Sequence, residues 1–158
     1  MASYTKQKRS EILSSILILL FVYTAVSKLL TIHQFLTVVD QYPLIGKLGG
    51  WVAWALPVSE LITAALLWFS KTRMKGFAVS LLLLISFTLY IGYMLIFYSK
   101  LPCSCGGIIS SLSWNQHVLL NIALIAIAFY GFMLERQYHT SAYIMSQQQS
   151  QSSNFLFE

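Results

Sequence analysis

Apolar residues gather in four long, nearly continuous stretches of this chain. The stretches cover residues 12–30, 51–69, 77–98 and 118–134. A helix needs roughly 20 apolar residues to cross a hydrocarbon core of about 30 Å, and each stretch has about that length. None shows the strict alternation of a membrane barrel strand, so only helices satisfy the backbone polar groups in lipid. The pattern therefore predicts an all-α integral membrane protein, folded as a four-helix bundle.

The composition supports a lipid environment for most of the chain. Hydrophobic residues make up 57% of it and charged residues 9%, which is far from the balance of a soluble domain. The first stretch follows Lys6, Lys8 and Arg9, as the core of a secretory signal would. Its apolar run is too long for such a core, and we expect it to remain as the first span.

The remaining segments divide the chain into a basic tail at 1–10, a transmembrane domain at 11–136 and a polar tail at 137–158. The polar tail contains the run QQQSQSSN and has too few apolar residues to pack, which predicts disorder. Residues 31–50 predict a short interfacial helix followed by a turn near a pair of glycines.

Two further signals place the last three spans. The polar segment 70–75 is short, which makes the second and third spans antiparallel neighbours. Ser113 and Gln116 have the spacing of a capping box, so the last helix is expected to begin near Trp114.

The distribution of basic residues predicts the orientation. The end of the bundle that carries both termini holds Lys6, Lys8, Arg9, Lys71, Arg73, Lys75 and Arg136, whereas the opposite end holds Lys28, Lys47 and Lys100. The positive-inside rule therefore places both termini in the cytoplasm of a bacterial inner membrane, and the loop between spans three and four in the periplasm. Topology thus explains the net charge of +5. The chain has no basic stripe with interleaved aromatic residues, which a nucleic-acid-binding surface would show.

The predicted periplasmic loop contains the chain's two cysteines, Cys103 and Cys105, in the motif LPCSCGG. Disulfides persist on that side of a membrane. A bond across one intervening residue closes a very small loop, which favours strain and easy reduction. Gly106 and Gly107 give the backbone freedom to turn after the thiols. The pair is therefore a candidate for thiol–disulfide exchange.

Three other interpretations of the cysteines stay open, namely a static disulfide, two free thiols and a site for a soft metal. A closed zinc site needs about four ligands, and the nearby sequence adds only His117. No metal site is therefore assigned. Nothing in the chain resembles a phosphate-binding Gly-rich loop or a hydrolase triad, so nucleotide and hydrolytic chemistry have no support.

An intramembrane carboxylate is the second candidate for chemistry. Glu60 falls near the middle of the second span, one turn after Pro57, where an isolated charge costs at least a few kcal/mol. It must be neutral, paired or hydrated, and Lys28 at the outer end of the first span is the expected partner. The pair either fixes helix register, with Lys28 otherwise extending to the headgroups, or handles protons during thiol or quinone chemistry.

His117 and Asn121 are four residues apart and share a face at the outer end of the last span. If the cysteine loop folds over this face, His117 favours a thiolate or accepts its proton. The alternative is an interfacial histidine with no chemical role.

Five motifs in order carry a family resemblance: FVYTAVSKLL, QYPLIG, LPVSELITAALL, LPCSCGG and LSWNQHVLLN. Together they resemble the methylamine-utilisation MauE family, within the DoxX-like membrane proteins, over about residues 12–134. The resemblance implies a four-helix fold similar to disulfide-generating membrane oxidoreductases. It also implies a role in maturation or disulfide formation of an exported partner. The positions that match the family are Lys28, Pro57, Glu60, Cys103, Cys105, Gly106 and Asn121.

Two positions depart from the family pattern. Gly107 stands where the family often has an aromatic residue, and His117 lies where an arginine closer to Asn121 is expected. These differences put anion or partner contacts at that end in doubt.

Three functional hypotheses follow. The first is a membrane thiol–disulfide oxidoreductase acting on an exported or envelope client. The chain has one cysteine pair and so cannot pass electrons to a second pair of its own. A bound quinone or another protein must therefore accept the electrons. The second is a non-enzymatic accessory subunit that braces an envelope complex among membrane lipids, with the cysteines as a static clip. The third is a soft-metal transport component.

Overall fold

A computed structural model describes residues 2–40, 49–97 and 114–155, and the described part is helical. Its helices are α1 (Ala2–Leu30), α2 (Ile32–Asp40), α3 (Gly49–Trp68), α4 (Arg73–Phe97) and α5 (Trp114–Phe155). Four of them are long and apolar enough to cross a membrane, with candidate spans Thr5–Leu30, Gly49–Trp68, Arg73–Tyr93 and Gln116–Ser141. The predicted all-α architecture with four spans is confirmed. The side of the membrane that the termini face stays a prediction.

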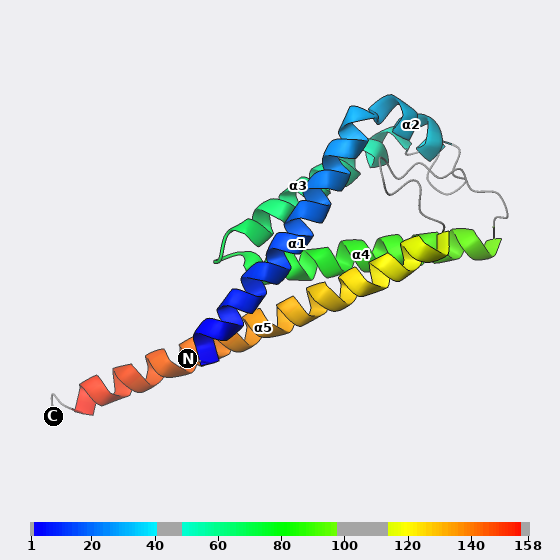
Figure 1. Ribbon diagram of the computed structural model, residues 1–158. Coiled ribbons are helices and arrows are strands. Elements are labelled where there is room, and N and C mark those ends of the chain that lie inside the picture. The colour runs from blue at the N-terminus through cyan, green and yellow to red at the C-terminus, as the bar shows by residue number, and fades with distance from the viewer. Residues whose placement is uncertain (1, 41–48, 98–113, 156–158) are drawn as a thin grey trace.

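The four long helices form two pairs, α1 with α3 and α4 with α5. The pairs lie close together near the N-terminus and diverge toward the opposite end of the bundle (Figure 1). The short helix α2 packs on α3 through Phe35 and Ala53 at the diverging end. The bundle thus has a close end, with the N-terminus and the α3–α4 turn, and an open end, where α1 joins α2.

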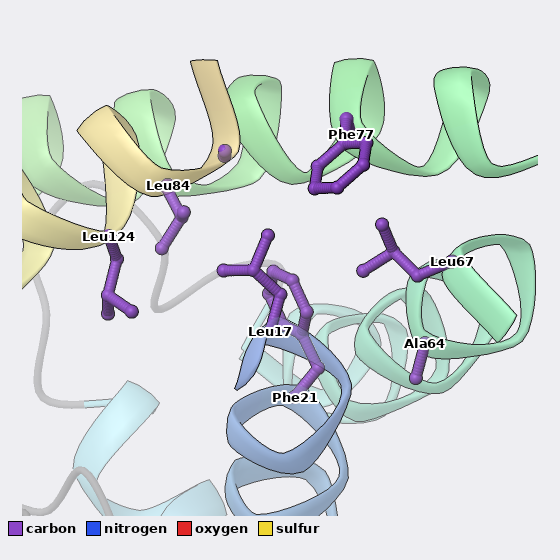
Figure 2. Close-up of a cluster of buried hydrophobic side chains, with 8 residues drawn as sticks. Leu17, Phe21, Ala64, Leu67, Phe77, Leu84 and Leu124 are labelled. Carbon is purple, nitrogen blue, oxygen red and sulfur yellow. The ribbon is translucent and has the colours of Figure 1, made fainter. Parts of the chain in front are cut away.

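Every long helix contributes to one apolar core (Figure 2). Its buried members are Leu17 and Phe21 of α1, Ala64 and Leu67 of α3, Phe77 and Leu84 of α4, and Leu124 and Ala128 of α5. A Cβ atom on Gly76 would lie 2.8 Å from the backbone nitrogen of Leu67, so this glycine lets α4 approach α3 closely. Small residues serve the same purpose in other membrane bundles, because close backbone approach increases van der Waals contact.

Hydroxyl groups within the spans are satisfied locally. Thr63 donates a hydrogen bond to the Ser59 carbonyl at 2.7 Å, Ser80 to the Gly76 carbonyl at 2.8 Å, and Thr88 to the Leu84 carbonyl at 2.6 Å. Side chains that bond the preceding turn of their own helix need no partner from lipid.

The helix ends agree with several sequence predictions and differ from others. α5 begins at Trp114 and α2 occupies the segment expected to hold a short helix. α3 starts at Gly49, two residues before the predicted span that begins at Trp51. α5 also continues through Phe155, whereas composition predicts a disordered tail from 137 onward. Extending an existing helix avoids the cost of nucleation, so a polar sequence can continue one that the apolar span has started.

Candidate functional site

An ion pair inside the bundle joins α1 to α3. Lys28 lies in the last turn of α1, and its Nζ atom is 2.6 Å from Oε1 of Glu60. The two side chains are 9% and 13% exposed, so the pair is largely removed from solvent. The predicted contact between these two residues is confirmed.

Pro57 is buried inside α3, one turn before Glu60. Because proline has no N–H group, the Ala53 carbonyl loses its helical hydrogen bond at this point. Ser59 also interrupts the regular pattern, since its hydroxyl donates to the Leu56 carbonyl at 2.7 Å. The turn that presents Glu60 is therefore more polar than the rest of the helix.

A cavity of about 90 Å³ lies beside the ion pair, between α1, α3, α4 and α5. Its polar lining comes from Thr24, Lys28, Ser59, Glu60, His117 and Asn121. Its apolar lining comes from leucines and phenylalanines, namely Leu20, Phe21, Leu56, Leu83, Leu84, Phe87, Leu120 and Leu124. Polar groups from three helices thus meet in one apolar chamber.

The size of the cavity limits what it accepts. At roughly 30 Å³ for each molecule in the liquid, the volume corresponds to about three waters. A cavity that binds benzene in another protein measures about 150 Å³. The chamber, as the described residues line it, therefore suits small hydroxyl-bearing groups.

Two buried polar atoms in the cavity wall have no hydrogen-bond partner among the described residues, Oε2 of Glu60 and Nδ2 of Asn121. The carboxylate oxygen accepts a hydrogen bond and the amide nitrogen donates one. Asn121 is only 5% exposed, so these requirements are not met by bulk solvent. A group in the cavity that donates to Glu60 or accepts from Asn121 would satisfy one of these atoms.

His117 adds an imidazole to the same chamber. It is 7% exposed, lies one turn before Asn121 on α5, and packs edge-on against Phe87 with the ring centroids 5.8 Å apart. The sequence places His117 at the end of the last span, and the structure buries its ring among the helices there.

The structure therefore brings together Lys28, Glu60, His117 and Asn121, with Pro57 supporting them. Cys103, Cys105, Gly106 and Gly107 lie outside the described residues. α5 begins at Trp114, three residues before His117. The segment that carries the cysteines thus joins the bundle at the end that contains the cavity.

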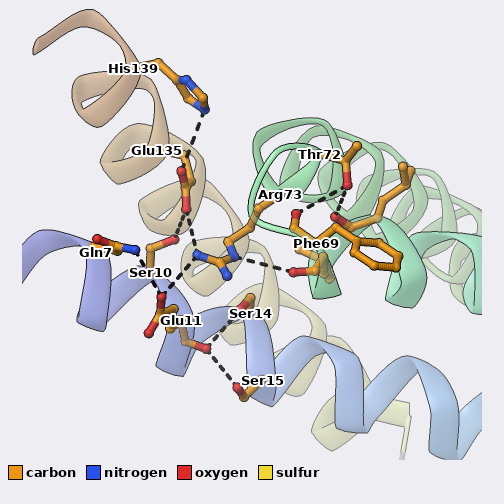
Figure 3. A network of polar contacts seen from close by, with 12 residues as sticks. Gln7, Ser10, Glu11, Ser14, Ser15, Phe69, Thr72, Arg73, Glu135 and His139 are labelled. Carbon is orange, nitrogen blue, oxygen red and sulfur yellow. Dashed lines mark hydrogen bonds and ion pairs between the residues drawn. The ribbon is translucent and has the colours of Figure 1, made fainter. Parts of the chain in front are cut away.

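A second polar network, at the close end, was not foreseen (Figure 3). Nη1 of Arg73 lies 3.3 Å from Oε1 of Glu135 and 3.8 Å from Oε1 of Glu11. The Ser10 hydroxyl donates to the same oxygen of Glu135 at 2.6 Å, and Arg73 Nε donates to the Leu67 carbonyl at 3.5 Å. One feature of the sequence points to this network. Glu135 directly follows an apolar span, and a carboxylate at that position needs a partner.

Comparison with known proteins gives one match. The family model described as methylamine utilisation protein MauE matches residues 6–134. The matched segment contains the ion pair, His117, Asn121 and both cysteines. Neither the curated proteins nor the solved structures include a match to this chain.

Proposed function

The chain belongs to the MauE family of membrane proteins, and we propose that it exchanges a disulfide with an exported partner protein through Cys103 and Cys105. The partner is a client with a pair of thiols that must be oxidised during maturation. The activity is that of a thiol–disulfide oxidoreductase.

One observation carries this proposal: the buried Lys28–Glu60 pair opens onto a cavity at the end of the bundle where the cysteine segment attaches. Buried polar groups in folded proteins are normally hydrogen-bonded. Oε2 of Glu60 and Nδ2 of Asn121 have no hydrogen-bond partner within the described residues, and an imidazole shares the chamber. Such an arrangement suits proton transfer.

The reaction conserves electrons and protons. A client thiolate attacks one sulfur of the Cys103–Cys105 disulfide and forms a mixed disulfide, which the second client thiolate then resolves. Two electrons pass to the cysteine pair, and the client leaves oxidised. The protons lost by the client thiols end on Cys103 and Cys105, with His117 and Glu60 as the groups that transfer them.

The reduced pair must then be oxidised again. A second disulfide-bearing protein does this by the same exchange in reverse, and its own thiols carry away the electrons. We favour this route because it needs only the exchange chemistry that the cysteine pair itself supplies.

Substitution of the cysteines tests the proposal directly. We expect Cys103→Ser and Cys105→Ser each to abolish client disulfides, scored by alkylation and gel shift, while the protein still inserts. Ser104→Ala, between the two thiols, is the matched control and should retain activity. If the client stays oxidised in both cysteine variants, the chain is an accessory subunit instead.

The role of the cavity has its own test. General acid–base groups contribute roughly 10² to 10⁴ in rate, so Glu60→Gln should slow exchange by at least about 10². Thr63→Val on the same helix is the control, because its buried hydroxyl bonds only the Ser59 carbonyl. Equal rates for Glu60→Gln and wild type would remove the carboxylate from the mechanism.

The location belongs to the proposal as well. We propose a bacterial inner membrane, with the cysteine segment in the periplasm. A thiol reagent that does not cross lipid should label a reduced Cys103 in intact spheroplasts. It should not label a cysteine introduced at Gln137, and the reverse pattern contradicts the proposal.

A further inference from the structure

We propose that a second cavity, at the close end of the bundle, binds the phosphate group of an anionic phospholipid. The cavity measures about 210 Å³. Its lining comes from the first turns of α1, the α3–α4 turn and α5, and comprises Lys6, Gln7, Ser10, Ser70, Lys71, Arg73, Leu134, Glu135, Tyr138 and His139.

The cavity lies at the level of lipid headgroups. The apolar part of α1 starts just after Ser10, α3 ends at Trp68, and the apolar run of α5 ends at Leu134. Trp68 and Phe69 are 70% and 62% exposed there, as expected for aromatic residues at a membrane interface. Three independent span ends therefore place the cavity where lipid phosphates lie.

The charges of the lining favour an anion. Glu135 is the carboxylate among the lining residues, and Arg73 and Ser10 already occupy its Oε1 atom. Lys6 donates to the neutral side-chain amide of Gln137 at 3.1 Å, so its charge has no counterion there. Lys71 is exposed and has no ion pair or hydrogen bond within the described part of the chain. Two ammonium groups therefore face the cavity uncompensated.

The size and the donors select a phosphate group over a larger anion. The volume corresponds to about seven waters, which is enough for a phosphate and a few of its hydrating waters. Ammonium groups act as point donors to phosphate oxygens, and the Ser70 hydroxyl lies on the same wall. A headgroup with its own cation would be repelled by Lys6 and Lys71, so the glycerol-type headgroup of phosphatidylglycerol fits best.

This site lies at the other end of the bundle from Glu60 and the cysteine segment. It does not depend on the proposed disulfide exchange. A failure of one proposal leaves the other untouched.

The test uses the purified full-length protein and native mass spectrometry with added lipid. We expect phosphatidylglycerol to bind at least about tenfold more tightly than phosphatidylcholine. Lys6→Ala and Lys71→Ala should each weaken phosphatidylglycerol binding about fivefold, which is the effect of one basic residue near an anionic membrane surface. Lys8→Ala and Lys75→Ala, exposed cations of the same end that do not line the cavity, are the matched controls.

Each outcome decides the proposal. Selective loss in the two cavity variants supports it. Equal loss in the Lys8 and Lys75 variants shows diffuse surface charge and overturns it, as does equal binding of the two lipids. A separate arm with inorganic phosphate alone identifies the source: if phosphate displaces phosphatidylglycerol at equal concentration, the ligand is free phosphate and the lipid assignment is wrong.

Discussion

The two ends of the bundle each bury a cation against a carboxylate, but they satisfy the charges to different degrees. At the close end, Arg73 contacts Glu135, Glu11 and the Leu67 carbonyl, and Ser10 also donates to Glu135. At the open end, Lys28 meets Glu60 through one oxygen, while the other oxygen has no hydrogen-bond partner among the described residues.

The space around the glycines also differs between the two ends of the bundle. A Cβ atom on Gly131 would collide with the Phe77 ring, and one on Gly76 with the backbone of α3, both in the close half. A Cβ atom on Gly50 or Gly92, toward the open end, would meet no atom of the described residues within 4 Å. The glycines of the close half therefore allow close helix contact, whereas the described parts of the open end show no such contact at Gly50 or Gly92.

Physical chemistry explains what the difference between the two ion pairs means for their stability. Removing two charges from water is costly, and the attraction between them offsets that cost only when further hydrogen bonds satisfy the remaining atoms. The Arg73 network meets this condition. Within the described residues, the Lys28–Glu60 pair does not meet it, because Oε2 of Glu60 has no hydrogen-bond partner there.

The largest expected effect is at the close end. Glu135→Ala leaves Arg73 buried without its nearest counterion, which should lower the free energy of unfolding by about 3–5 kcal/mol. Denaturation in mixed micelles, followed by circular dichroism, measures the change. The double variant Arg73→Met/Glu135→Leu is the control, and we expect it to recover most of the loss. A change below about 1 kcal/mol for Glu135→Ala would remove the distinction between the two ends.

A smaller effect is expected at the open end. Lys28→Met should lower the free energy of unfolding by about 2.5–3.5 kcal/mol, the insertion cost of an unpaired charge near a helix centre. The loss should be smaller than for Glu135→Ala because Glu60 borders a cavity that admits water. Lys28→Met/Glu60→Leu should restore the wild-type value in the same assay. If Lys28→Met is the more destabilising of the two single variants, the open end carries the structural pair instead.

The smallest effect concerns the glycines of α4. Gly76→Ala should destabilise the bundle by about 1–3 kcal/mol, because the added methyl group meets the backbone of α3. Gly92→Ala on the same helix should be neutral or stabilising by up to about 1 kcal/mol, since alanine favours helix and nothing obstructs it. Thermal unfolding of both variants in parallel provides the measurement, and equal effects would show that the two ends are packed alike.

Much of the fold follows from local pattern. Four apolar stretches predict four spans, and the Ser113–Gln116 spacing predicts the start of α5 at Trp114. The contact of Lys28 with Glu60 was also foreseen, because an intramembrane carboxylate requires a partner and few cations lie at the right depth. The extension of α5 to Phe155 was not foreseen. The composition of a segment indicates whether it can pack into a core, but it does not show that a preceding helix can continue into it.

The sequence by itself determined the spans, the unusual carboxylate and the paired cysteines, because hydrophobicity and residue type act over one or two turns of helix. Only the tertiary structure decided that His117 and Asn121 share a cavity with Glu60, and that Arg73 reaches Glu135 across 62 positions of the chain. Such contacts depend on how helices cross and diverge, which arises from the packing of many side chains at once.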